Sequence, residues 1–111
     1  MSPSTHPRAV DPSPLFAALG DATRLALVRR LSTEGALSVT SLTKGTRISR
    51  QAVTKHLAVL ARAGLVESER RGRERLWALA PGQLDEARRA LEQISREWDE
   101  ALGRLRRLVE R

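Results

Sequence analysis

The last third of the chain carries the pattern that most limits what it can fold into. Between residues 82 and 111, apolar side chains recur at alternating spacings of three and four, the heptad pattern of a helix that packs along one stripe. The stripe consists of Leu84, Ala87, Leu91, Ile94, Trp98, Ala101, Leu105 and Leu108. Such a stripe can cover the domain's own core. A helix of roughly 40 Å outreaches the small body before it, however, so we expect the part from Leu91 onward to pack against a second copy, with Trp98 as its anchor.

A second stretch, from Ile48 to Gly64, has the marks of a short helix with both ends defined. Ser49 is a good N-terminal cap, and Gly64 supplies the left-handed residue that ends many helices. Three apolar residues between them follow helical spacing and predict one buried stripe: Val53, Leu57 and Leu60.

The opposite face of this helix is basic and rich in polar groups, and the helix contains no acid. Such a face suits the major groove of DNA, where Arg and Gln reach base edges and Lys reaches phosphate. We expect Arg50, Gln51 and Thr54 to read bases, and Ser49 and Lys55 to contact phosphate. The alternative is an ordinary surface helix with a solvated basic face, so the flanking sequence has to decide.

The placement of charge supports a polyanionic partner. Lys and Arg exceed Asp and Glu by seven, and the whole excess lies before residue 82, because the last segment has equal numbers of acids and bases. A localised basic excess with a pI near 11.5 is typical of nucleic-acid binding. An acidic membrane surface is the competing partner, but no basic amphipathic helix with bulky aromatic residues supports it.

Composition also excludes several classes of protein. There is no cysteine, which excludes disulfides and Cys-ligated metal sites. No run of about 18 apolar residues is present, and the N-terminus lacks the apolar stretch of a signal peptide. We therefore expect a cytoplasmic protein without membrane contact. Its length fits one domain, whose core is built mainly from Leu, Val, Ile and Ala.

The chain before residue 48 predicts a proline-rich arm and three helices. Residues 1–13 form the flexible arm, residues 14–80 the DNA-binding part and residues 81–111 the terminal helix of the same domain. A short apolar helix ends at Gly20, and Asp21 caps a second one that runs to about Thr33. Its expected inward residues are Leu25, Val28 and Leu31. Ser38 caps a third, short helix whose inward residues are Val39 and Leu42.

A short helix, a tight turn containing Gly45 and a capped basic helix form the helix-turn-helix pattern. After Gly64 the pattern becomes that of two strands, residues 65–69 and 73–79, joined by a turn over residues 70–72. The hairpin is a candidate wing whose arginines hold the DNA backbone: Arg70, Arg71, Arg73 and Arg75. A solvated hairpin tip is the alternative, and three nearby glutamates partly offset the charge according to the face they occupy. The fold class is thus mainly α, a winged helix-turn-helix with a two-stranded wing and a long C-terminal dimerisation helix.

This order of elements resembles the ArsR/SmtB family of winged helix-turn-helix repressors. The resemblance lies in the Leu-Phe-Ala-Ala-Leu-Gly-Asp-Ala-Thr-Arg-Leu sequence of residues 15–25, in residues 48–66 with their Val-Thr-Lys-His-Leu-Ala-Val-Leu core, and in residues 73–79. It implies a homodimer paired through its first and last helices, which binds an inverted-repeat operator, a pseudo-palindrome in double-stranded DNA, and blocks the promoter. The dimer interface implied is Leu15, Phe16, Leu19, Leu91, Ile94, Trp98, Ala101, Leu105 and Leu108.

The chain departs from the metal-sensing members of that family. Those members carry a cysteine pair on the third helix or Asp and His ligands on the last helix, and here the third helix has no thiol and the last no histidine. The two histidines, His6 and His56, fall on the arm and on the basic helix, a poor arrangement for Zn²⁺. We therefore expect no metal and no cofactor, as in the metal-independent branch, whose members often regulate their own genes. His56 is expected to pack at the edge of the motif or to touch phosphate.

Two other function classes compete with a DNA-binding repressor. The same dimeric fold could bind an acidic protein partner, although the acid-free basic face argues for DNA. An enzyme has almost no support, because the sequence has no Gly-rich phosphate loop, no His paired with a nucleophile and no carboxylate pair in an evident pocket. The sequence does not indicate a small-molecule effector, although Phe16 and Trp98 could meet in a pocket between the first and last helices.

Overall fold

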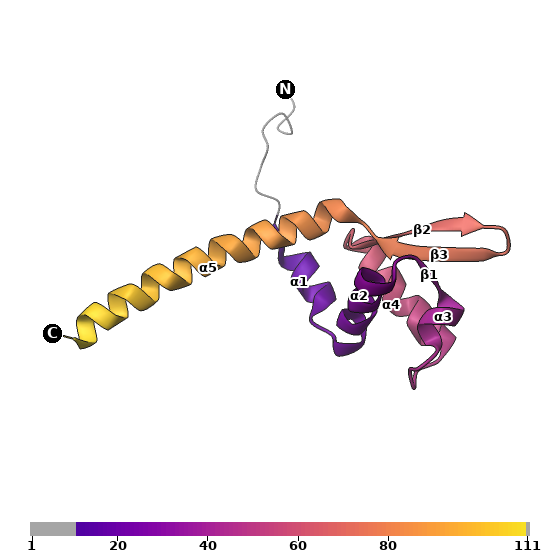
Figure 1. Ribbon diagram of the computed structural model, residues 1–111, viewed down its shortest axis with the longest axis horizontal. Coiled ribbons are helices and arrows are strands. Elements are labelled where there is room, and N and C mark those ends of the chain that lie inside the picture. Colours follow the sequence, from indigo (N-terminus) through magenta and orange to yellow (C-terminus); the bar gives the residue numbers. More distant parts are fainter. Residues whose placement is uncertain (1–10, 111) are drawn as a thin grey trace, which may run out of the picture.

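A computed structural model describes residues 11–110 of the chain, and Figure 1 shows their arrangement. Helices dominate, with a small antiparallel sheet and one long helix at the C-terminus, so the expected mainly α winged helix-turn-helix is confirmed. The expected N-terminal arm lies, up to residue 10, outside the described residues. The elements are α1 (Ser13–Leu19), α2 (Ala22–Glu34), β1 (Leu37–Ser38), α3 (Val39–Thr43), α4 (Arg50–Arg62), β2 (Val66–Arg71), β3 (Glu74–Leu79) and α5 (Pro81–Val109).

Side-chain caps start three of the helices where the sequence predicts them. Asp21 accepts two backbone N–H groups of the first turn of α2, at 2.9 and 3.0 Å. The Ser38 and Ser49 hydroxyls each accept one backbone N–H, of α3 and α4 respectively, at 3.1 Å. Gly64 follows α4 with φ +78°, the left-handed conformation that glycine adopts without strain. The bounds of the helix-turn-helix are therefore set by local chemistry.

The core lies where α1, α2, α3 and α4 meet the sheet. The predicted stripe of α4 is completely buried: Val53, Leu57 and Leu60. In α2 the expectation for Leu25 is wrong, because that side chain is 43% exposed and Leu27 is buried instead. Leu27 and Leu31 are one helical turn apart and flank Val28, so these three form a narrower inward stripe than one that begins at Leu25.

The wing hairpin belongs to a three-stranded sheet of order β1-β3-β2. The third strand, β1, has only two residues, too few for a sequence pattern to reveal, and it pairs with β3. The predicted turn is also wrong: β2 extends to Arg71, and the two-residue turn is Gly72–Arg73. Gly72 has φ +63°, which is typical of the first central residue of a tight type II′ hairpin turn.

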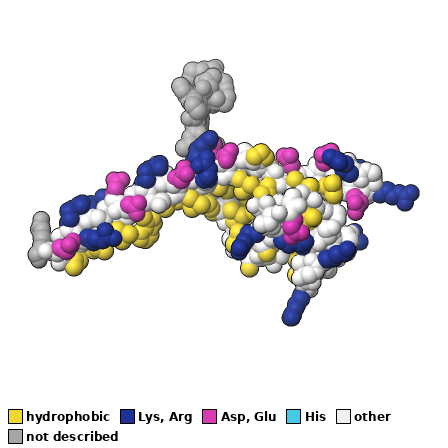
Figure 2. Space-filling model, in the orientation of Figure 1, with side chains coloured by type: hydrophobic (Ala, Val, Ile, Leu, Met, Phe, Trp, Pro, Cys, Tyr) yellow, Lys and Arg dark blue, Asp and Glu magenta, His cyan; other side chains and the backbone are white. Residues whose placement is uncertain are grey.

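Helix α5 is held by the body only near its start. Ala87 is buried and Leu84 is half-buried. From Leu91 to Glu110 every residue is exposed except the half-buried Gly103. The helix projects away from the rest of the fold in Figure 1, and Figure 2 shows hydrophobic side chains gathered along one side of it. Among residues 11–110, no helix is long and apolar enough to cross a membrane.

Candidate nucleic-acid interface

The basic face of α4 points to solvent because its other face is anchored in the core. Complete burial of the Val53, Leu57 and Leu60 stripe fixes the rotation of the helix about its axis. The residues opposite are all exposed and, together with Val39 of α3, they line an open hollow of about 580 Å³: Arg50, Gln51, Thr54 and Lys55. The structure thus brings together four of the predicted DNA-binding residues.

The hydrogen bonds of this face define what each side chain can still do. The Thr54 hydroxyl donates to the Arg50 carbonyl oxygen at 2.9 Å, so it retains only its acceptor capacity and its methyl group. Ser49 accepts a backbone N–H as a cap and keeps its own O–H proton. Within the described residues, no hydrogen bond occupies the amide of Gln51. A polar face with such open donors and acceptors is suited to reading base edges.

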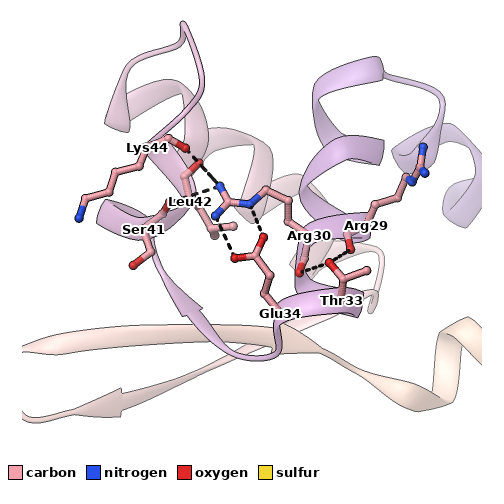
Figure 3. Close-up of polar contacts among 7 residues, drawn as sticks. All are labelled: Arg29, Arg30, Thr33, Glu34, Ser41, Leu42 and Lys44. Atoms are coloured by element: carbon pink, nitrogen blue, oxygen red, sulfur yellow. Dashed lines mark hydrogen bonds and ion pairs between the residues drawn. The ribbon is translucent and has the colours of Figure 1, made fainter.

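Arg30 of α2 holds the end of α3 in place. As Figure 3 shows, its guanidinium reaches the carbonyl oxygens at the end of α3, with Nη1 donating to Ser41 at 3.3 Å and Leu42 at 3.1 Å. The same group pairs with Glu34 at 2.9 Å. The hydrogen bond from Arg30 holds the pKa of the Glu34 carboxyl below its ordinary value. Carbonyls that a helix end leaves unsatisfied thus find a donor, and α2 and α3 are linked.

Arg24 makes a comparable link around α4. Its Nε donates to the carbonyl oxygen of Ala18 at 2.6 Å, near the end of α1, and its Nη1 lies 3.4 Å from Nδ1 of His56. His56 is half-buried on the side of α4 that faces α2, next to the exposed groove face. Packing at the motif's edge, one of the two roles expected for His56, fits this placement better than phosphate contact.

The strand register separates the charges of the wing onto two faces. Arg70 lies directly opposite Arg75, and Ser68 opposite Trp77, so these side chains share the face that packs on the core, here called the inner face. The outer face carries Glu67, Glu69, Arg71 and Glu74. Arg71 pairs there with Glu69 at 3.2 Å. The three glutamates therefore lie on the opposite face of the wing from Arg70 and Arg75. Arg71 lies on the same outer face as the glutamates.

The predicted dimer residues fall into two groups. Leu15 is only 3% exposed and belongs to the protomer's own core, so it is not available to a partner. Phe16 and Leu19 are half-buried. The others are exposed along α5: Leu91, Ile94, Trp98, Ala101, Leu105 and Leu108. Because Trp98 is 62% exposed, it remains available to a partner.

Two positioning residues were not predicted from the sequence. Arg24 and Arg30 of α2 both reach backbone carbonyls of neighbouring helices. The Arg30–Glu34 spacing is a recognisable ion-pair signal, but the carbonyl contacts depend on tertiary packing. Among residues 11–110, no three His, Cys, Asp or Glu side chains gather in a way that could hold a metal ion.

Comparison with known proteins points in one direction. Residues 19–69 match the family described as "Helix-turn-helix domain". The chain is 37% identical over 99 residues to the HTH-type transcriptional regulator Rv2034 of Mycobacterium tuberculosis, covering 89% of each protein. It is 31% identical over 100 residues to the arsenic resistance transcriptional regulator ArsR1 of Pseudomonas putida, covering 86% of this chain and 78% of that protein.

Solved structures agree with these sequence matches. An ArsR-like transcriptional regulator from Rhodococcus sp. RHA1 superposes with a TM-score of 0.71 at 37% identity, covering 87% of this chain and 91% of that one. The homodimeric winged helix-turn-helix domain of Mb0332 from Mycobacterium bovis, a possible ArsR-family transcriptional regulator, gives a TM-score of 0.61 at 27% identity, covering 77% of each chain.

Proposed function

This chain belongs to the ArsR-type winged helix-turn-helix transcriptional regulators, which bind DNA and are not enzymes, and we propose that it acts as a dimeric repressor. In this proposal the dimer binds an inverted-repeat operator and represses by occupying the promoter. The observation that carries it is the exposed, acid-free face of α4, whose orientation is fixed by three fully buried residues.

Each polar residue of α4 has a proposed role. Gln51 and Thr54 read bases, since both are exposed and line the hollow beside α3. Lys55 and the Ser49 hydroxyl contact phosphate and so set the register of the helix on the duplex. Arg50 and the wing arginines add further contacts to DNA.

The proposed dimer forms through the apolar stripe of α5, with Phe16 and Leu19 of α1 at its edge. Support comes from the row of exposed apolar side chains that begins at Leu91, a patch that soluble monomers rarely leave uncovered. The homodimeric state of the Mb0332 domain supports a homodimer here as well. Two copies related by a two-fold axis require a pseudo-palindromic site with half-sites about 10 bp apart.

We further propose that repression does not respond to metal ions. The sequence contains no cysteine, so α3 offers no thiolate ligand, and α5 contains no histidine, so it offers no imidazole ligand. These are the ligands that soft and borderline metal ions prefer. Operator affinity is therefore expected to stay the same when Zn²⁺ or arsenite is added. A metal-dependent loss of affinity would contradict this part of the proposal.

Replacement of Gln51 tests base reading directly. Sites selected from random duplexes by the wild type and by Gln51→Ala should differ at one position of each half-site, where the variant loses roughly 1–3 kcal/mol of discrimination. Gln93→Ala is the matched control, because Gln93 lies exposed on α5 and, within residues 11–110, its side chain bonds only to α5 neighbours. An unchanged preference in the Gln51 variant would show that this residue does not read bases.

A further inference from the structure

The inner face of the wing carries a charge arrangement that costs stability. Arg70 and Arg75 are directly opposite each other on β2 and β3, and like charges in that relation repel. Within the described residues, the register places the three wing glutamates on the outer face, although Glu74, the first residue of β3, also lines the hollow between the wing and the helix-turn-helix. The Nη1 of Arg75 donates to Ser68 Oγ at 2.9 Å, which holds the guanidinium against the hairpin. An anion beside this pair would relieve the repulsion.

A hollow lined by arginines lies where the wing meets the helix-turn-helix. It measures about 200 Å³ and is lined by three arginines and one glutamate, together with small polar residues at the start of α3. Arg50 comes from α4, whereas Arg73 and Arg75 come from the wing, so the hollow joins the two DNA-binding units. Its lining is Ser38, Val39, Thr40, Arg50, Arg73, Glu74 and Arg75.

We propose that this hollow binds one phosphate of the DNA backbone, held jointly by Arg50, Arg73 and Arg75. The inference rests on the proposed DNA-binding function and adds a specific contact to it. Guanidinium groups bind phosphate oxygens through short, charge-assisted hydrogen bonds, and several can share one tetrahedral anion. Glu74, which also lines the hollow, lowers the net charge of the site, which suits a singly charged phosphodiester.

The neighbourhood of the hollow favours backbone phosphate over a free anion. Arg50 and Val39 line both this hollow and the open one that contains Gln51, Thr54 and Lys55. A phosphate held here therefore lies beside the face that enters the major groove. One consequence is that Arg50, expected from the sequence to read a base, is assigned to phosphate. Another is that the wing and α4 grip the same phosphate, which fixes the register of the helix in the groove.

A scan of single neutral phosphates tests the assignment. The preferred operator is synthesised with one methylphosphonate at a time, and the affinity of each duplex is measured for the wild type, Arg50→Ala and Arg75→Ala. For the wild type, one position per half-site should lose about tenfold in affinity, as expected for one charge-assisted contact. Both variants should lose their sensitivity at that same position while keeping it elsewhere. Arg89→Ala, a charge-matched control on α5 where Arg89 pairs with Glu86, should retain the wild-type profile.

Other outcomes overturn the proposal in distinguishable ways. If Arg50 and Arg75 map to different phosphates, or if Arg50→Ala changes a preferred base and no phosphate, the shared site is wrong although the protein still binds its operator. If no sequence is preferred at all, the proposed function itself fails. Added inorganic phosphate, compared with chloride at equal ionic strength, identifies the source of the anion. Displacement of DNA or a rise in Tm that depends on Arg75 would show a site for free phosphate instead.

Discussion

Truncation of Trp98 is the sharpest test of the proposed dimer. The side chain is 62% exposed on α5, in the middle of the apolar stripe. Aromatic side chains of this kind bury roughly 150–250 Å², so covering the exposed part removes on the order of 150 Å² from water. At about 25 cal/mol per Å², this burial contributes about 4 kcal/mol per protomer as an upper bound.

Part of that gain is lost to ordering of the interface, and we expect Trp98→Ala to cost about 2–3 kcal/mol per protomer. A symmetric dimer contains the residue twice, so the dimer dissociation constant should rise by about 10³-fold or more. Sedimentation equilibrium over a wide range of protein concentrations measures this change directly. Glu100→Ala is the control, because Glu100 lies two residues further along α5 and outside the stripe.

Two results would refute the reasoning about α5. One is a wild-type protein that stays monomeric at every concentration up to the millimolar range. The other is a Trp98→Ala variant that dimerises as tightly as the wild type and the Glu100→Ala control. Far-UV circular dichroism of the variant should show retained helix, which separates a lost interface from a lost fold.

Three further predictions concern the core, the response to acid and the α2–α3 link. Leu57→Ala should lower the free energy of unfolding by about 2–5 kcal/mol, since Leu57 is completely buried; a loss below about 1 kcal/mol in urea denaturation would contradict the core assignment. The pKa of Glu34 is lowered by its bond from Arg30, and that of Asp21 by the backbone N–H of Arg24, so both stabilise the fold when ionised. The stabilisation from these two ionised carboxyls is present above their unfolded-state pKa and is lost as the pH falls through their lower folded-state pKa. Tm should therefore drop below about pH 4. An equal drop in the Glu34→Gln variant would exclude the Arg30–Glu34 ion pair as a source of this acid sensitivity. Arg30→Ala should lower the Tm and operator affinity together, because α3 loses its carbonyl donor, whereas Arg29→Ala, a nearby exposed control, should change neither.

Local signals explain what the sequence predicted well. The caps at Asp21, Ser38 and Ser49 and the glycine after α4 fix helix ends through contacts within a few residues, which spacing alone reveals. The basic face of α4 could be predicted in the same way, because its polar residues and the buried stripe lie within one continuous segment of the sequence. The family comparison confirmed the fold and the DNA-binding class that these patterns indicated.

The errors arose where several packings fit the same residues. Leu25 and Leu27 are both apolar, and only contact with the other helices selects Leu27 for the core. The short helix α1 is apolar nearly all round, so its sequence could not say that Leu15 faces inward. In the wing, the sequence assigned Arg70 and Arg71 to the turn. The strand instead continues through Arg71, and the turn begins at Gly72, whose φ is positive. The strand alternation then places Arg71 on the outer face. The carbonyl contacts of Arg30 join residues 11–14 apart and depend on how α2 meets α3.

The central claim is that this protein binds a specific operator as a symmetric dimer. Genome-wide capture of bound DNA, followed by titration of the top site at two salt concentrations, tests it most directly. We predict a pseudo-palindromic site near the protein's own promoter, bound by two protomers with an affinity that falls steeply with salt. Weak binding that is equal on all sequences would contradict the claim and would direct attention to an acidic protein partner.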